Sequence, residues 1–141
     1  MKIKRLQEIT EKVEEAFQRL IPQLSANCMG PGRDELNSMV HSGNSVLFVA
    51  EEDGNIIGTL TLVMYRIPTG IKAWIEDVVV DETMRGKGIG RMLIRHAIDH
   101  AKKSGVMKID LTSVPFRLAA NGLNKSMGFA RRETNVYRLE L

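Results

Sequence analysis

Basic and glycine residues alternate in one short segment of the chain, Arg85-Gly86-Lys87-Gly88-Ile89-Gly90-Arg91. The segment follows the apolar run Val78-Val79-Val80 and precedes a helical pattern. Glycines at such a junction let the backbone turn sharply and bring its N–H groups close to an anion. The helix dipole adds partial positive charge at the same place, and the three basic side chains add full charges. The segment therefore predicts a phosphate or diphosphate site.

Two well-known phosphate-binding loops do not fit this spacing. A P-loop has a glycine, four residues and then Gly-Lys-Ser/Thr, whereas Gly86-Lys87-Gly88 has neither that spacing nor the hydroxyl group. The dinucleotide fingerprint Gly-x-Gly-x-x-Gly fails because Arg91 stands where its third glycine belongs. Both interpretations are excluded, and a tight glycine turn without a ligand remains as the structural alternative.

A third pattern, Arg/Gln-x-x-Gly-x-Gly/Ala after a strand and at the start of a helix, is met by Arg85, Gly88 and Gly90. Here the sequence resembles the GNAT N-acetyltransferase superfamily, whose members bind acetyl-CoA through this loop. The run Ile75-Glu76-Asp77 is similar to a strand of the glucosamine-phosphate N-acetyltransferases in that family. The resemblance covers about residues 73–129.

The resemblance implies direct transfer of acetyl from acetyl-CoA to a primary amine of a small molecule or peptide, through a ternary complex. The cofactor would lie where two parallel strands splay apart, here those ending near Val80 and Thr112. Backbone groups of the first strand would hold the pantetheine arm and polarise the thioester carbonyl, as an oxyanion hole does. The residues expected to bind acetyl-CoA are Val78, Val79, Val80, Arg85, Gly86, Lys87, Gly88, Ile89, Gly90, Arg91 and Arg117.

Glu76 is the first candidate for a general base. An amine with a pKa of about 10.4 is mostly protonated near neutral pH, so a group that removes its proton is useful. Unbroken alternation along the strand would place Glu76 on the same side as Val78 and Val80, with Asp77 on the other side. Anchoring a substrate ammonium or pairing with a structural arginine are the alternative roles of Glu76.

A second family block, Ala-x-x-x-Tyr-x-x-x-Gly-Phe, is partly matched by Ala120, Gly128 and Phe129. Asn124 stands where the family has the tyrosine that protonates the departing thiolate. Because a thiol has a pKa of about 8.5, the thiolate can leave without a proton from an acid. We expect Asn124 to donate a hydrogen bond to the sulfur in place of the tyrosine.

Two further departures bear on the same block. Arg117 replaces a family asparagine, and it either reaches a CoA phosphate or lies on a solvated helix face. Tyr137 and Ser126 are alternative acids that no pattern favours. The missing tyrosine favours the competing function class, a catalytically inactive acyl-CoA-binding regulatory domain.

The order of elements predicts an α/β fold, a single GNAT-like domain. We expect a mixed, mostly antiparallel sheet with helices on both faces and a splayed central parallel strand pair. The domain would extend over residues 1–141. It would comprise an N-terminal half with the acceptor-site loops at 1–72, an acetyl-CoA-binding core at 73–129 and a C-terminal strand within 130–141.

Local signals give the boundaries of several elements. Apolar residues at helical spacing predict an amphipathic helix from Leu6 to Leu20 that ends before Pro22. A short helix follows near 34–41, with Asp34 as its cap. Asp53-Gly54 between two β-rich runs predicts a hairpin, and the residues 136–141 predict a last strand.

The composition is that of a globular protein, with 43% hydrophobic and 26% charged residues. A net charge of +3 and 5% aromatic residues argue against nucleic-acid binding, whereas a local surplus would suit one anionic cofactor. The single Cys28 excludes an intramolecular disulfide. His96 and His100 have the i, i+4 spacing of zinc ligands but lack a third ligand, so we expect solvated histidines and no metal.

No apolar run approaches the roughly 20 residues of a membrane span, and the N-terminus lacks the apolar stretch of a signal peptide. We therefore expect a cytoplasmic protein without a membrane partner.

No motif identifies the amine acceptor. We expect its pocket to be formed by residues 25–33, the second helix and the turn at 66–71. Trp74 and Met29 would line that pocket or pack in the core. A homodimer is common in the family, and the sequence leaves it open.

Overall fold

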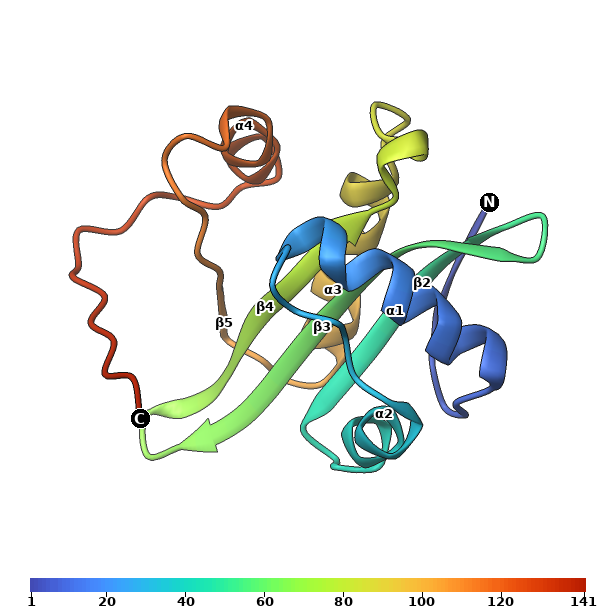
Figure 1. The fold of residues 1–141 in the computed structure, drawn as a ribbon. Helices are drawn as coiled ribbons and strands as arrows, with labels where there is room; N and C mark the ends of the chain where they lie inside the picture. Colours follow the sequence, from blue (N-terminus) through green and yellow to red (C-terminus); the bar gives the residue numbers. More distant parts are fainter. The chain divides into compact units, whose positions relative to one another are not determined.

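A computed structural model describes residues 1–141 and contains one five-stranded sheet (Figure 1). The strands are β1 (Lys2–Arg5), β2 (Ser45–Glu52), β3 (Asn55–Ile67), β4 (Gly70–Val80) and β5 (Lys108–Asp110). The helices are α1 (Glu11–Leu24), α2 (Arg33–Val40), α3 (Ile89–Lys103) and α4 (Leu118–Ser126), with a 3-10 turn η1 (Glu82–Met84). The chain divides into two compact units, residues 1–111 with the sheet and residues 112–141 with α4.

The strands follow one another across the sheet in the order β1-β2-β3-β4-β5. The first three pairs are antiparallel, whereas β4 and β5 are parallel. The parallel pairing extends only from Lys72 opposite Lys108 to Trp74 opposite Asp110. Beyond it, residues 75–80 of β4 have no strand partner on that side. This confirms the predicted mixed sheet with a parallel pair that splays apart.

Helices cover both faces of the sheet, as predicted. In Figure 1, α1 crosses the near face over β3 and β4, and α3 lies behind the sheet. The apolar stripe of α1, which includes Phe17 and Leu20, packs in one cluster with Leu47, Val49 and Val79. On the opposite face, α3 buries Leu93 completely. The helix that follows the glycine segment is therefore held against the sheet by its buried apolar side chains.

The hairpin between β2 and β3 confirms the turn predicted at Asp53-Gly54. Both residues have positive φ, 51° at Asp53 and 76° at Gly54. Two left-handed residues match the right-handed twist of the strands that they join, which explains why Asp-Gly is favoured there.

Several predicted helix boundaries are wrong. The first helix begins at Glu11 and not at Leu6, because Thr10 caps it by accepting from Val13 N at 3.3 Å. The first helix does not end before Pro22 but continues to Leu24. Because Pro22 lies in the last turn, its missing N–H costs one helical hydrogen bond, and Ser25 N still donates to Ile21 O at 3.0 Å. The cap of α2 is Gly32, which has no side chain to bond, and Asp34 lies inside the first turn. A carboxylate there still interacts favourably with the helix dipole.

The unit of residues 112–141 contains one helix, α4. The strand predicted at 136–141 is wrong, since this segment has no regular structure. Alternating apolar residues favour a strand but supply no partner for the backbone, and this unit contains no other strand. Val136, Tyr137 and Leu139 are accordingly exposed. The extent of the predicted domain over residues 1–141 and its division into 1–72 and 73–129 stay predictions.

None of the four helices combines the length and the apolar character that a membrane crossing requires.

Candidate functional site

The glycine segment connects the end of β4 to the start of α3. Gly86 and Gly88 have φ of 80° and 79°, in the left-handed region that favours glycine. A Cβ at either position would meet no atom within 4 Å, so the backbone conformation and not the available space requires glycine. Gly88 is the N-cap of α3 and offers no side-chain hydrogen bond. No side chain caps the first N–H groups of α3. Uncapped N–H groups at a helix N-terminus are available to bind an anion.

The charged side chains of the segment 85–91 are all positive. The first turn of α3 contains no acidic residue. Arg85 donates from Nε to Val80 O at 3.2 Å, which leaves its two Nη groups for an anion. The Nζ atom of Lys87 lies 3.8 Å from Met84 Sδ, a weak acceptor. The structure thus places Arg85, Gly86, Lys87 and Gly88 in one turn directly before α3, where the helix dipole adds partial positive charge.

The last six residues of β4 form the second part of the site. Because β5 pairs only as far as Trp74, the backbone of residues 75–80 is open on the β5 side. Val79 is buried with 4% of its surface exposed, whereas Val78 and Val80 are half-buried. An open strand edge beside an uncapped helix can bind an extended ligand through main-chain groups.

A β-bulge interrupts this half of β4. Glu76 lies opposite Thr61 and Val79 opposite Thr59, so two residues, Asp77 and Val78, face one residue of β3. Asp77 has a φ of 48°, the left-handed conformation that aspartate tolerates better than most residues.

The bulge corrects the predicted direction of Glu76. Thr59 and Thr61 are two residues apart on β3 and share one face, so their partners Val79 and Glu76 share it also. Val80 follows Val79 and faces the other side. The prediction that Glu76 and Val80 point the same way rested on unbroken alternation, and the extra residue breaks it.

The carboxyl group of Glu76 is electrostatically suited to accept a proton. Partial burial raises its pKa above the ordinary value, and the adjacent Asp77 carboxylate raises it further. A raised pKa makes a carboxylate a stronger base, provided that it is still ionised at working pH. The side chain itself reaches solvent, so a substrate amine can approach it.

Two aromatic side chains lie on the same face as Glu76. Trp74 is two residues before Glu76 and is half-buried. Its Nε1 donates to the hydroxyl of Tyr65 at 2.9 Å, which fixes the orientation of the indole ring. Met29 is 86% exposed. Packing in the core, one of the two sequence alternatives, is therefore wrong for Met29, whereas Trp74 is partly buried.

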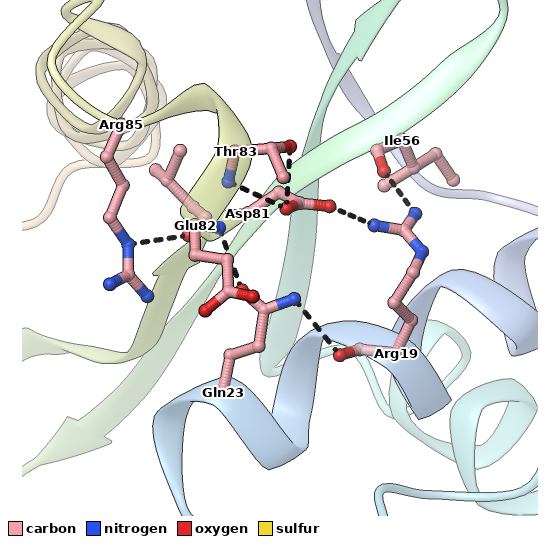
Figure 2. Close-up of polar contacts among 8 residues, drawn as sticks. Arg19, Gln23, Ile56, Asp81, Glu82, Thr83 and Arg85 are labelled. Carbon is pink, nitrogen blue, oxygen red and sulfur yellow. Dashed lines mark hydrogen bonds and ion pairs between the residues drawn. The ribbon is translucent and has the colours of Figure 1, made fainter.

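A polar network that the sequence did not reveal holds the residues just before the glycine segment (Figure 2). Asp81, the first residue after β4, caps η1 by accepting from Thr83 N at 3.1 Å. Arg19 and Gln23 of α1 reach Asp81 and Glu82 across the fold. The residues lie about sixty positions apart in the chain, so no local pattern signals the contact.

The remaining predicted site residues belong to the unit of residues 112–141. Arg117 is the N-cap of α4, and Asn121 Nδ2 donates to its carbonyl at 2.8 Å. Asn124 lies on α4, and its backbone oxygen accepts from Phe129 N at 3.1 Å. Ser126 Oγ donates to Leu123 O at 2.7 Å. The roles of Arg117 and Asn124 stay predictions.

Of the two histidines of α3, His96 is exposed, as expected from the sequence, whereas His100 is half-buried. Both rings pack edge-on against Phe48 of β2, with centroids at 5.4 Å for His96 and 5.5 Å for His100. Burial, followed by the positive charge of Arg5, lowers the pKa of His100. No group of three or more His, Cys, Asp or Glu side chains in residues 1–141 is arranged to hold a metal ion.

Comparison with known proteins identifies similar sequences and folds. The model of the Acetyltransferase (GNAT) family matches residues 7–129. Human N-acetyltransferase 8B is 28% identical over 108 residues, 75% of this chain and 48% of the relative. Glucosamine 6-phosphate N-acetyltransferase 1 of Oryza sativa subsp. japonica is 31% identical over 62 residues, 44% of this chain and 36% of the relative. The chain thus spans half or less of the length of these curated relatives.

One solved structure shows the same fold. An aminoglycoside acetyltransferase from an uncultured soil metagenomic sample, determined in complex with sisomicin, superposes with a TM-score of 0.86. The two sequences are 23% identical, and the alignment covers 99% of this chain and 95% of the other. At this level of identity the likeness concerns the fold.

Proposed function

Because the chain belongs to the Acetyltransferase (GNAT) family, we propose that it transfers an acetyl group from acetyl-CoA to a primary amine, within a complex of both substrates. The observation that carries the proposal is the open half of β4 beside the uncapped, positively charged turn at Arg85–Gly90. The residues fit the cofactor, because left-handed glycines free of nearby atoms leave room for a diphosphate at the helix start.

Each part of the site would have one task. The N–H groups at the start of α3, together with Arg85 and Lys87, would hold the diphosphate of acetyl-CoA. Main-chain groups of Val78 to Val80 would hold the pantetheine arm along the open edge of β4. Acetyl-CoA supplies an activated acetyl thioester. An N–H group aimed at the developing negative charge on the carbonyl oxygen would stabilise it as an oxyanion hole does.

Glu76 would act on the acceptor. Its carboxylate removes a proton from the ammonium group, directly or through water, so that the neutral amine can attack. The raised pKa of Glu76 matches this task. Asn124 would donate a hydrogen bond to the sulfur of the leaving thiolate, and Arg117 would contact a CoA phosphate.

We propose a small polar amine as the acceptor. One relative is named for glucosamine 6-phosphate, an amino sugar. In this chain, the carboxylate of Glu76 and the indole ring of Trp74 lie on one face, and a carboxylate beside an aromatic ring suits an ammonium group. A cytoplasmic location and a homodimer stay part of the proposal, the former because the exposed thiol of Cys28 suits a reducing compartment.

The proposal is tested by measuring CoA release. Purified protein is incubated with acetyl-CoA and a panel of amino sugars, polyamines and peptides, and free thiol is followed with a chromogenic disulfide. Release that depends on one class of amine supports the proposal and names the acceptor. The variant Gly88→Glu, which adds a negative side chain at the strained cap of α3, should abolish acetyl-CoA binding while the far-UV circular dichroism is retained.

A regulatory acyl-CoA-binding domain is the second candidate, and the asparagine at position 124 favours it. Tight acetyl-CoA binding by calorimetry without thiol release for any amine would select this candidate. Absence of binding would contradict both.

A further inference from the structure

Two side chains of α1 reach the segment that joins β4 to the glycine turn (Figure 2). Arg19 forms an ion pair with Asp81, and its Nη2 also donates to Ile56 O at 2.8 Å. Gln23, one helical turn further along, accepts from Glu82 N at 2.9 Å through Oε1. Its Nε2 donates to Arg19 O at 3.3 Å, so the amide is held by its own helix. Consecutive residues of the connection are thus attached to α1.

Asp81 is the residue at which the chain leaves the sheet. Its N–H donates to Ile57 O at 2.8 Å, and its carbonyl accepts from Met84 N at 2.8 Å. Its carboxylate accepts from both the N–H and the hydroxyl of Thr83, at 3.1 and 3.0 Å. These hydrogen bonds, with the charge of Arg19, hold the pKa of Asp81 below its ordinary value. Asp81 is therefore ionised at neutral pH and carries the negative charge that pairs with Arg19.

The segment after Asp81 has little packing of its own. The turn η1 has three residues, and none of them is buried. Gly86 and Gly88 have no atom near the place of a Cβ. When such a segment becomes ordered on binding a ligand, it loses conformational entropy. Contacts that already hold the segment in the free protein reduce this loss.

We propose that Arg19 and Gln23 are positioning residues for the diphosphate of acetyl-CoA. They do not touch the ligand. They fix residues 81 and 82, and the bond from Arg85 Nε to Val80 O closes the same connection from its other end. The N–H groups of the turn are thereby held in the conformation that the diphosphate requires. This inference rests on the proposed function, since it assigns these two side chains to the cofactor half of that site.

The test compares CoA with pantetheine, which lacks the diphosphate together with the 3′-phosphoadenosine attached to it. Dissociation constants of both ligands are measured by calorimetry for the wild type, Arg19→Met and Gln23→Met. We expect Arg19→Met to weaken CoA binding about tenfold, the effect of losing hydrogen bonds to a charged group. Pantetheine binding should be unchanged. Arg19→Lys keeps the charge but not the second bond to Ile56 O, and it should recover part of the CoA affinity.

The ion pair itself is tested by a double-mutant cycle. Asp81→Asn keeps an oxygen that can accept from Thr83 but removes the charge opposite Arg19. If the two groups act as one unit, the double variant Arg19→Met/Asp81→Asn should bind CoA no more weakly than the poorer single variant.

Lys4→Met is the control, because it breaks an ion pair between β1 and β2, Lys4 Nζ to Glu51 Oε2 at 2.7 Å, that has no part in the proposed site. It should change neither affinity. Equal losses for CoA and pantetheine in Arg19→Met, or no loss in either single variant, would overturn the inference while leaving the proposed function intact. Failure of the wild type to bind CoA would overturn both.

Discussion

Asp77 adopts a left-handed backbone conformation directly beside Glu76 on β4, and its carboxylate contributes to the raised pKa of Glu76. The same residue opens the bulge that turns Glu76 to the face of Val79 and away from that of Val80. One position therefore controls both the direction of the candidate base and part of its electrostatic environment.

Asp77→Asn should lower the pKa of Glu76. Asparagine tolerates the left-handed conformation, so the bulge is kept while the negative charge is lost. A base acts in its deprotonated form, so a lower pKa should extend activity to lower pH. The acidic limb of the kcat/KM profile should move down, with the plateau at higher pH unchanged. Asp77→Gly, which also keeps the backbone, should give the same shift. A limb that stays in place in both variants would contradict the electrostatic role of Asp77.

Glu76→Gln should remove the acidic limb and lower kcat by about a hundredfold near neutral pH, as loss of a general base does. The deficit should shrink as the pH approaches the pKa of the acceptor amine, because the neutral amine then forms without help. Glu82→Gln is the control, because it removes another carboxylate, in η1. The hydrogen bond of Glu82 in Figure 2 comes from its backbone N–H and not from its side chain. A deficit independent of pH would instead indicate that Glu76 anchors the substrate.

Gly58→Ala should loosen the attachment of α3 to the sheet. A Cβ at this position would lie 3.2 Å from Val79 O and 3.3 Å from Leu93 Cδ1. Overpacking of this kind costs about 1–3 kcal/mol. Urea unfolding should show the loss of stability, and CoA affinity should fall because the start of α3 is displaced. Gly32→Ala is harmless by comparison, since its Cβ would meet only Glu35 Oε1 at 4.0 Å. Equal stability of the two variants would refute this account of Gly58.

Gly88→Ala tests the backbone conformation at the cap of α3 alone. No atom obstructs the added methyl group, but a φ of 79° costs a residue with a Cβ about 1–2 kcal/mol. Relaxation of that strain should move the N–H groups of the turn and weaken CoA binding. Gly88→Asn should lose less affinity, because asparagine accepts the left-handed region more readily. If alanine and asparagine bind CoA as well as glycine does, the left-handed cap is not needed for the cofactor.

The sequence predicted those features that depend on short-range physical chemistry. The spacing of Gly86 and Gly88 between an apolar strand and an apolar helical stripe indicated the strand–turn–helix unit, and the structure shows both glycines with positive φ. The Asp53-Gly54 turn was predictable for the same reason. The family resemblance supplied the splayed pair, which the short pairing of β4 with β5 confirms.

Features that depend on distant residues were not predictable. Nothing in the run Ile75-Glu76-Asp77 signals that Asp77 is left-handed, because the bulge arises from the pairing with β3. The contact between Arg19 and Asp81 joins residues 62 positions apart. The segment 136–141 alternates as a strand does, but alternation gives no information on whether a partner is present in its unit.

The order of the strands across the sheet is also their order along the chain. Each new strand therefore adds at one edge of those that precede it, and none has to be inserted between two that are already paired. The meander from β2 to β4 requires only short loops to close, whereas β5 must wait for α3 to form and cross the sheet. We expect the hairpins to form first, because their contacts are local, and the parallel pair that borders the site to form last.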